Sequence, residues 1–288
     1  MSVLYDLPGP RARRRNRVVG LAAGLMLAGF AVYVVIRFIQ TGQFNAAKWQ
    51  QFEYVSVQRS LLSGLGATLT AAGLASVLAL VFGAVFAAAR LSLIGPLRRL
   101  ATGVVELFRA VPLLILIFFA YYVPLQYGFA LPKLWSLVLG LTLYNGSVLA
   151  EIFRAGILAV PKGQTEAAAA IGLSRGQTLR LIQLPQAVRA MLPAIVSQLV
   201  VLLKDTALGF IITYPELLFE SKQIGGKLVF ELPYVPTYLV TGALYIAICG
   251  LLSFLAYRLQ RRLARSPAAL TRTVAMGTTA RTPTDVGA

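Results

Sequence analysis

The chain contains 288 residues, of which 58% are hydrophobic and only 13% are charged, and its mean hydropathy is +0.74. Soluble domains usually carry about 25% charged residues, so this composition is typical of an integral membrane protein. Histidine is absent and the single cysteine, Cys249, lies in an apolar run, which excludes disulfide frameworks and cysteine-cluster metal sites. The P-loop pattern G-x-x-x-x-G-K-[S/T] is also absent. We therefore expect no catalytic residues, no metal site and no bound cofactor in this chain.

Six segments are long and apolar enough to cross a bilayer as a helix, which takes about 20 residues. They are residues 18–39, 61–88, 103–124, 135–157, 191–214 and 236–257. The fifth is the least regular, because Lys204 and Asp205 interrupt it. The sequence therefore predicts an all-α integral membrane protein with six transmembrane helices.

The formal net charge of +17 can be explained by where lysine and arginine lie around these spans. If the N-terminus is cytoplasmic, 18 of these residues fall in cytoplasmic segments and five in external ones. Because cytoplasmic loops are enriched in positive residues, we expect a multi-pass protein of the plasma membrane with both termini in the cytoplasm. This topology accounts for most of the charge, so a nucleic-acid partner is not expected.

The two ends of the chain differ from its middle. The first span follows a basic stretch and is either a membrane helix or a signal peptide. Its apolar part of about 20 residues favours an uncleaved helix, because signal peptides carry about 7–15. The end of the chain is rich in Thr, Ala and Pro and is predicted to be disordered. The sequence thus divides into a basic cytoplasmic N-terminus (1–17), an extra helix with an external loop (18–59), a transmembrane core (60–257) and a cytoplasmic tail (258–288).

The segment between the fourth and fifth spans, residues 158–190, is predicted to form two short helices on the cytoplasmic side. The first runs from about Lys162 to Ile171 and is rich in alanine, and Gly172 suits the left-handed residue that ends it. Ser174 with Gln177 forms a capping-box pattern at the start of the second helix, which Pro185 is expected to end or kink. Such a helix pair either docks on a partner or simply joins two spans.

The same segment resembles the EAA loop of ABC-importer permeases. The residues that carry the resemblance are Glu166, Ala167, Ala168, Gly172, Ile182, Leu184 and Pro185. Residues 106–114, 151–157 and 203–208 resemble further motifs of polar amino-acid permeases, so that the likeness covers about 60–257, or five of the six spans. The N-terminal stretch 3–10 is similar to the opening of actinobacterial glutamate-type permeases. We call residues 158–190 the coupling segment.

This resemblance implies the other parts of a transport machine. The chain would be a five-helix permease core plus one N-terminal helix, forming half of a translocation pathway for a polar amino acid, with glutamate as the best guess. Its partners would be separate ABC ATPase subunits, a second permease that is a paralogue rather than an identical copy, and an extracytoplasmic amino-acid-binding protein. The alternative is a secondary carrier or membrane enzyme without an ATPase. No internal repeat and no catalytic constellation in the sequence favours that alternative.

Charged side chains inside a span cost about 2.5–3.5 kcal/mol each on insertion, so each calls for a partner or a function. Glu106 and Arg109 near the start of the third span, and Glu151 and Arg154 near the end of the fourth, are both spaced i, i+3. Residues at that spacing are neighbours on a helix. We interpret them as two local ion pairs that anchor the span ends, or alternatively as groups that line an inner gate or brace the coupling segment.

A candidate substrate pathway is expected deeper in the membrane. Lys204 and Asp205 are adjacent and so face different directions on a helix, which means that each has a partner elsewhere or that the helix is irregular. Irregular backbone at mid-membrane often lines transporter sites. A zwitterionic amino acid needs an acceptor for its ammonium group and donors for its carboxylate. The candidate pathway residues are Lys204, Asp205, Thr206, Asn145 and Gln198, the alternative being a structural pair between two permeases.

The external loop, residues 215–235, carries charges of both signs. A mixture of that kind suits contact with a binding protein, and it equally suits an ordinary solvated loop.

Overall fold

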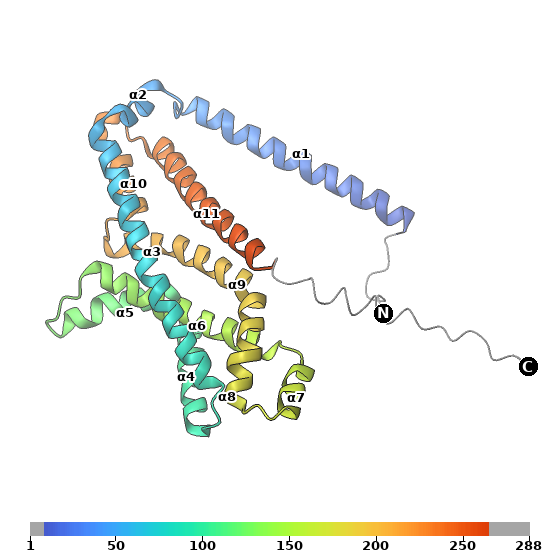
Figure 1. Ribbon diagram of the computed structural model, residues 1–288. Helices are drawn as coiled ribbons and strands as arrows, with labels where there is room; N and C mark the ends of the chain where they lie inside the picture. The colour runs from blue at the N-terminus through green and yellow to red at the C-terminus, as the bar shows by residue number, and fades with distance from the viewer. Residues whose placement is uncertain (1–8, 265–288) are drawn as a thin grey trace, which may run out of the picture. The chain divides into compact units, whose positions relative to one another are not determined.

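The computed structural model describes residues 9–264, and every regular element in that range is helical. The prediction of a disordered end falls on residues outside the described range. In chain order (Figure 1) the elements are α1 (Pro10–Gln40), α2 (Ala46–Trp49), the 3-10 helix η1 (Gln50–Glu53), α3 (Val55–Arg90), α4 (Gly95–Ala110), α5 (Leu113–Gln126), α6 (Lys133–Leu158), α7 (Lys162–Ala170), α8 (Arg175–Thr178), the π-helix η2 (Leu179–Gln183), α9 (Leu184–Asp205), the 3-10 helix η3 (Thr206–Ile212), α10 (Leu217–Gly225), the 3-10 helix η4 (Leu228–Phe230) and α11 (Tyr234–Ala264).

Five stretches of helix are long and apolar enough to cross a membrane, and a bent pair of helices is a sixth candidate. The five are Pro10–Gln40, Val55–Arg90, Lys133–Leu158, Arg175–Ile212 and Tyr234–Arg258. They correspond to the first, second, fourth, fifth and sixth predicted spans. The all-α membrane fold is therefore confirmed.

The third predicted span, residues 103–124, is not one straight helix. The chain forms α4 and α5 instead, and their axes meet at an angle of 99°. Val111, between the two helices, is extended (φ −81°, ψ 128°) and is followed by Pro112. Proline disfavours helical backbone at the residue before it and provides no N–H of its own, so the first helix must stop here. This proline lies inside the apolar run 103–124, so hydropathy alone does not show the break.

The helix that contains the fifth predicted span begins well before that span. From Arg175 to Ile212 the chain is helical without a break, so the predicted second short helix of the coupling segment is the first part of the same helix. Pro185 does not end this helix, so the first of the two predicted outcomes is wrong. The π turn η2 lies just before this proline, and its last bond runs from the N–H of Leu184 to the carbonyl of Leu179. Because the helix continues from η2 into α9, the missing N–H of Pro185 leaves one intrahelical bond unmade, and the π turn is the local irregularity beside it.

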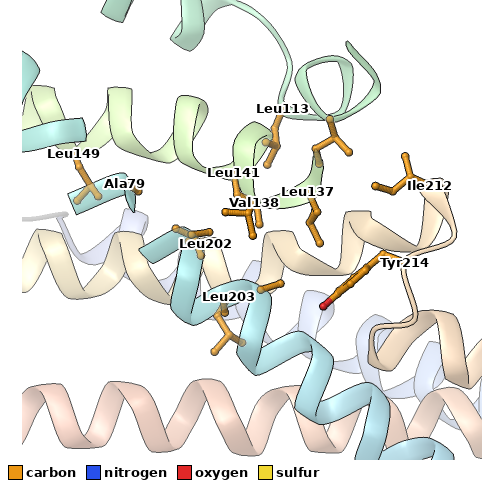
Figure 2. Packing of buried hydrophobic residues seen from close by; sticks show 14 of the residues in the cluster. Ala79, Leu113, Leu137, Val138, Leu141, Leu149, Leu202, Leu203, Ile212 and Tyr214 are labelled. Carbon is orange, nitrogen blue, oxygen red and sulfur yellow. The ribbon is translucent and has the colours of Figure 1, made fainter. Parts of the chain in front are cut away.

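The chain divides into two compact units, residues 59–221 with 240–288 and residues 1–58 with 222–239. In the larger unit α6 is central, and the side chains of Leu137, Leu141 and Leu149 are completely buried (Figure 2). Leu202 and Leu203 of α9 and alanines of α3 belong to the same cluster. Close approach depends on glycine: a Cβ on Gly83 would lie 2.8 Å from the Leu149 Cβ and 3.1 Å from the Ala150 nitrogen. Small residues at such contacts are how membrane helices pack tightly.

The smaller unit contains α1, which has no buried residue in the described chain. The predicted external loop after α1 is folded into α2 and η1. There the side-chain amide of Gln51 donates a 3.0 Å hydrogen bond to the hydroxyl of Thr237, and both residues are buried. The Tyr54 and Phe230 rings pack with centroids 5.2 Å apart. The loop is thus a structured element rather than a flexible link.

Candidate functional site

The turn that joins α7 to α8 depends on a glycine in left-handed conformation. Gly172 has φ +79°, as the sequence predicted for the residue that ends α7. The N–H of Leu173 bonds to the carbonyl of Ala168, and the N–H of Gly172 bonds to that of Ala169, both at 3.0 Å. These are the two bonds of a Schellman motif, which satisfies the last carbonyls of a helix. The turn is therefore a defined joint between two helices.

The far side of the joint is fixed by a capping box. The Ser174 hydroxyl accepts a bond from the Gln177 N–H, and the Gln177 side chain accepts one from the Ser174 N–H at 2.9 Å. This confirms the predicted cap. Near the start of α7, the side-chain amide of Gln186 of α9 lies 3.5 Å from the side-chain oxygen of Gln164. A pocket of about 450 Å³ lies beside α7 and has Thr165 and Ala169 in its wall.

The coupling-segment residues face both outwards and inwards. Glu166 and Ala167 are exposed, whereas Ala168 is buried and leaves only 1% of its surface accessible. Leu184 is 41% exposed, Pro185 is exposed and Ile182 is partly buried. The exposed side of α7 therefore offers a binding partner the Glu166 carboxylate next to the small apolar side chain of Ala167. The small side chain of Ala168 lets α7 lie close to the rest of the unit.

Three of the five candidate pathway residues meet where α6 packs on α9. The Gln198 amide donates a 2.7 Å bond to the side-chain oxygen of Asn145, which is completely buried. Asn145 donates through its own amide group to the Leu141 carbonyl at 3.2 Å, and its side chain also lies near the Asp205 carboxylate. Asn145 therefore lies between an amide and a carboxylate that are seven residues apart on α9.

The remaining two pathway candidates are not part of this group. Lys204 is exposed and forms no ion pair with any residue in the range 9–264. Thr206 is buried, and its hydroxyl donates a 2.6 Å bond to the carbonyl of Leu203, three residues earlier in the same helix. The helix changes from α to 3-10 at Thr206, which is the irregularity expected from the sequence. Lys204 and Asp205 thus face different surroundings and are not a pair.

An arginine cluster surrounds a single glutamate at the ends of α3, α4 and α6. Glu151 accepts bonds from Arg90 at 2.6 Å and from Arg154 at 2.7 Å, and Arg109 lies 3.8 Å away. The predicted local pair of Glu106 with Arg109 is therefore wrong. Glu106 is exposed and has no ion pair among the described residues, because Arg109, one turn further along α4, reaches Glu151 of α6 instead.

A buried carboxylate outside the spans escaped the sequence analysis. Glu216 has no exposed surface, and its two oxygens accept bonds from the N–H groups of Leu218 (2.8 Å) and Phe219 (2.7 Å) at the start of α10. The hydroxyl of Tyr245 donates a third bond of 2.8 Å. Burial raises the pKa of the Glu216 carboxyl from 4.5 to about 7, even though these bonds lower it. The available signal was an acidic residue just before the apolar run that begins α10, a typical helix start.

Comparison with known proteins agrees with this architecture. The family described as "Binding-protein-dependent transport system inner membrane component" matches residues 79–266. This chain belongs to that family. The match includes the coupling segment, the Asn145 group and the arginine cluster, whereas α1 and α2 precede it.

Individual relatives of this permease are similar over most of their length. It is 42% identical over 226 residues to the glutamate transport system permease protein GluD of Corynebacterium glutamicum, covering 77% of this chain and 82% of the relative. It is 34% identical to the glutamate/aspartate import permease protein GltK of Escherichia coli O157:H7, covering 74% and 99%. A crystal structure of an amino acid ABC transporter with histidines matches with a TM-score of 0.69 at 29% identity, covering 73% of this chain and 97% of that one.

Proposed function

We propose that this permease forms half of the membrane pathway of an ATP-driven importer for a polar amino acid, with glutamate as the first candidate. The observation that carries the proposal is the 42% identity to a glutamate transport permease. In this chain the coupling segment is also folded as a defined joint, with a left-handed Gly172 and a capping box at Ser174. ATP would be hydrolysed on a separate ABC ATPase. A secondary carrier would need no such segment.

The exposed face of α7 would be the contact with the ATPase. Glu166 and Ala167 are among its exposed residues, and the buried Ala168 determines how closely α7 lies on the rest of the unit. Because Arg175 to Ile212 is one continuous helix, a displacement at α8 is passed along the backbone towards Asp205. ATP binding and hydrolysis would in this way open the pathway to alternate sides of the membrane.

Asp205, Asn145 and Gln198 would form part of the substrate pathway. The Asp205 carboxylate is an acceptor suited to the ammonium group of an amino acid, and the two amides supply donors and acceptors for its polar groups. The arginine cluster carries more positive than negative charge, because one glutamate faces three arginines. Such an excess would favour an acidic substrate near the end of the pathway that lies at α3, α4 and α6.

The proposed orientation has both termini in the cytoplasm, which leaves the α7 joint on the same side as the ATPase. The surface around α10 would then face the extracytoplasmic binding protein. The second permease would be a paralogue of this chain. Its identity can be tested by purifying the assembled transporter and determining whether it contains one or two kinds of permease.

The decisive experiment is uptake of radiolabelled glutamate by proteoliposomes that contain this permease with its candidate paralogue, ATPase and binding protein. Uptake should require both internal ATP and the binding protein. Asp205→Asn should reduce it, whereas Ser197→Ala is the matched control, because Ser197 is exposed and, within residues 9–264, its hydroxyl bonds only to the Pro193 carbonyl of its own helix.

The other outcomes separate an error in the proposed substrate from an error in the proposed ATP-driven mechanism. ATPase stimulation by the binding protein loaded with another amino acid, without glutamate uptake, would overturn glutamate alone. Uptake by this permease without ATP would overturn the importer itself and support a secondary carrier.

A further inference from the structure

A second, larger cavity of about 790 Å³ lies in the larger unit, between the end of α3 and the run from α8 into α9. The α9 wall is apolar and consists of Leu184, Val188, Met191 and Ile195. Small side chains of α3, among them Ala84 and Ala88, form the opposite wall and leave the cavity open between the helices. We call this cavity the α3–α9 groove.

The groove has the length of one membrane leaflet. The four α9 residues are spaced by four, three and four positions, so they lie on one face of the helix. From the first to the last the helix rises about 16 Å. Half of the hydrocarbon core of a bilayer is about 15 Å thick. The apolar wall can therefore accommodate a chain of the length found in one leaflet.

The charged residues of the groove are all positive and all at one end. Arg175 and Arg180 line it beside Leu184, and the described lining contains no acidic side chain. Both arginines are exposed, and neither forms an ion pair with another residue of the range 9–264. Guanidinium groups bind phosphate oxygens through two parallel hydrogen bonds. An apolar track that ends at two uncompensated arginines is complementary to a molecule with an anionic head and an acyl tail.

We propose that the α3–α9 groove binds one anionic glycerophospholipid of the cytoplasmic leaflet. Its phosphate lies on Arg175 and Arg180, and an acyl chain runs along Leu184 to Ile195. The leaflet follows from the proposed orientation, which puts the α8 end of the groove in the cytoplasm, and basic pockets between helices on that side are suited to anionic head groups. Because both arginines belong to the coupling segment, the bound lipid holds α8 against α3.

The test is native mass spectrometry of the full chain, purified in a mild detergent and titrated with phosphatidylglycerol or with phosphatidylcholine of the same acyl chains. The wild type should retain one phosphatidylglycerol in preference to phosphatidylcholine. In the double variant Arg175→Gln/Arg180→Gln the preference should fall by about fivefold for each arginine removed. The double variant Arg15→Gln/Arg99→Gln is the matched control, because it removes two exposed positive charges outside the groove and should keep the preference.

A third variant tests the acyl track. Val188→Trp leaves both arginines in place but fills the groove, and it should reduce phosphatidylglycerol retention to that of the arginine variant. Equal retention of both lipids by the wild type would overturn the proposal, as would equal losses in the arginine variant and its control. A second copy of the chain that excludes lipid from the groove would also overturn it. None of these readouts depends on transport, so they stand apart from the test of the importer.

Discussion

Replacing Gly172 by valine should weaken the joint between α7 and α8 without disturbing its surroundings. Apart from the two neighbouring residues in the chain, no atom of the described structure lies within 4 Å of where a Cβ on Gly172 would be placed, so the Cβ itself meets no steric contact. The expected effect comes from the backbone, because φ is +79° and left-handed backbone costs an ordinary residue about 1–2 kcal/mol. That energy corresponds to about a 5- to 30-fold shift in the population of the turn.

The assay is the ratio of glutamate taken up to ATP hydrolysed in proteoliposomes of the whole transporter. Gly172→Val should lower the ratio of uptake to ATP hydrolysis by up to about 5- to 30-fold, while the amount of membrane-inserted protein stays unchanged. Gly172→Asn should have a smaller effect, because asparagine tolerates left-handed backbone. Gly163→Val tests the added bulk alone, since Gly163 also has open space around it but no positive φ. The reasoning is refuted if the valine and asparagine variants of Gly172 give the same ratio.

Three further predictions concern the polar groups. Asn145→Ala should raise the KM for uptake while thermal stability changes little, because such bonds between membrane helices contribute about 0.6 kcal/mol; an unchanged KM would remove Asn145 from the pathway. Glu151→Gln should lower stability by about 1.5–3 kcal/mol, since it leaves the arginines of the cluster without a counter-charge, and an unchanged Tm in detergent would contradict this. Because the pKa of Glu216 is raised from 4.5 to about 7, its folded form binds a proton that the unfolded form has lost. The contribution of Glu216 to stability should therefore be fully present below pH 4.5 and fall by about 1.4 kcal/mol per pH unit up to about pH 7, and Glu216→Gln should abolish this part of the pH dependence in Tm measurements.

Local patterns in the sequence were sufficient where a neighbour along the chain determines the structure. The glycine that ends α7 and the Ser174–Gln177 capping box follow from residues at most three positions apart, and both were predicted. The spans of α3, α6 and α11 follow from hydropathy alone. The caps depend on hydrogen bonds of the local backbone, and the spans depend on the transfer of apolar side chains into the membrane. Both are properties of a single helix.

Side-chain partners between helices could not be predicted in the same way. Arg109 has an acidic residue three positions before it, yet it approaches Glu151 on another helix, which depends on how α4 lies on α6. Glu216 lies in a stretch predicted to be a loop, yet it is buried and bonds to Tyr245, 29 residues further on. The roles of the coupling segment and of the pathway residues remain predictions that the proposed transport assays would test.

The π turn at Leu179–Gln183 has a consequence for the phase of the fifth span. A turn closed by bonds between residues five apart holds one residue more than an α-helical turn. The side chains of α8 and α9 therefore point in the directions expected if one residue were removed between them. The 3.6-residue apolar pattern of α8 does not continue in register into α9. In the sequence the helix therefore looks like two separate elements, although its backbone is continuous. The additional residue thus sets which side of α9 is turned towards α6 when α8 is held at the joint.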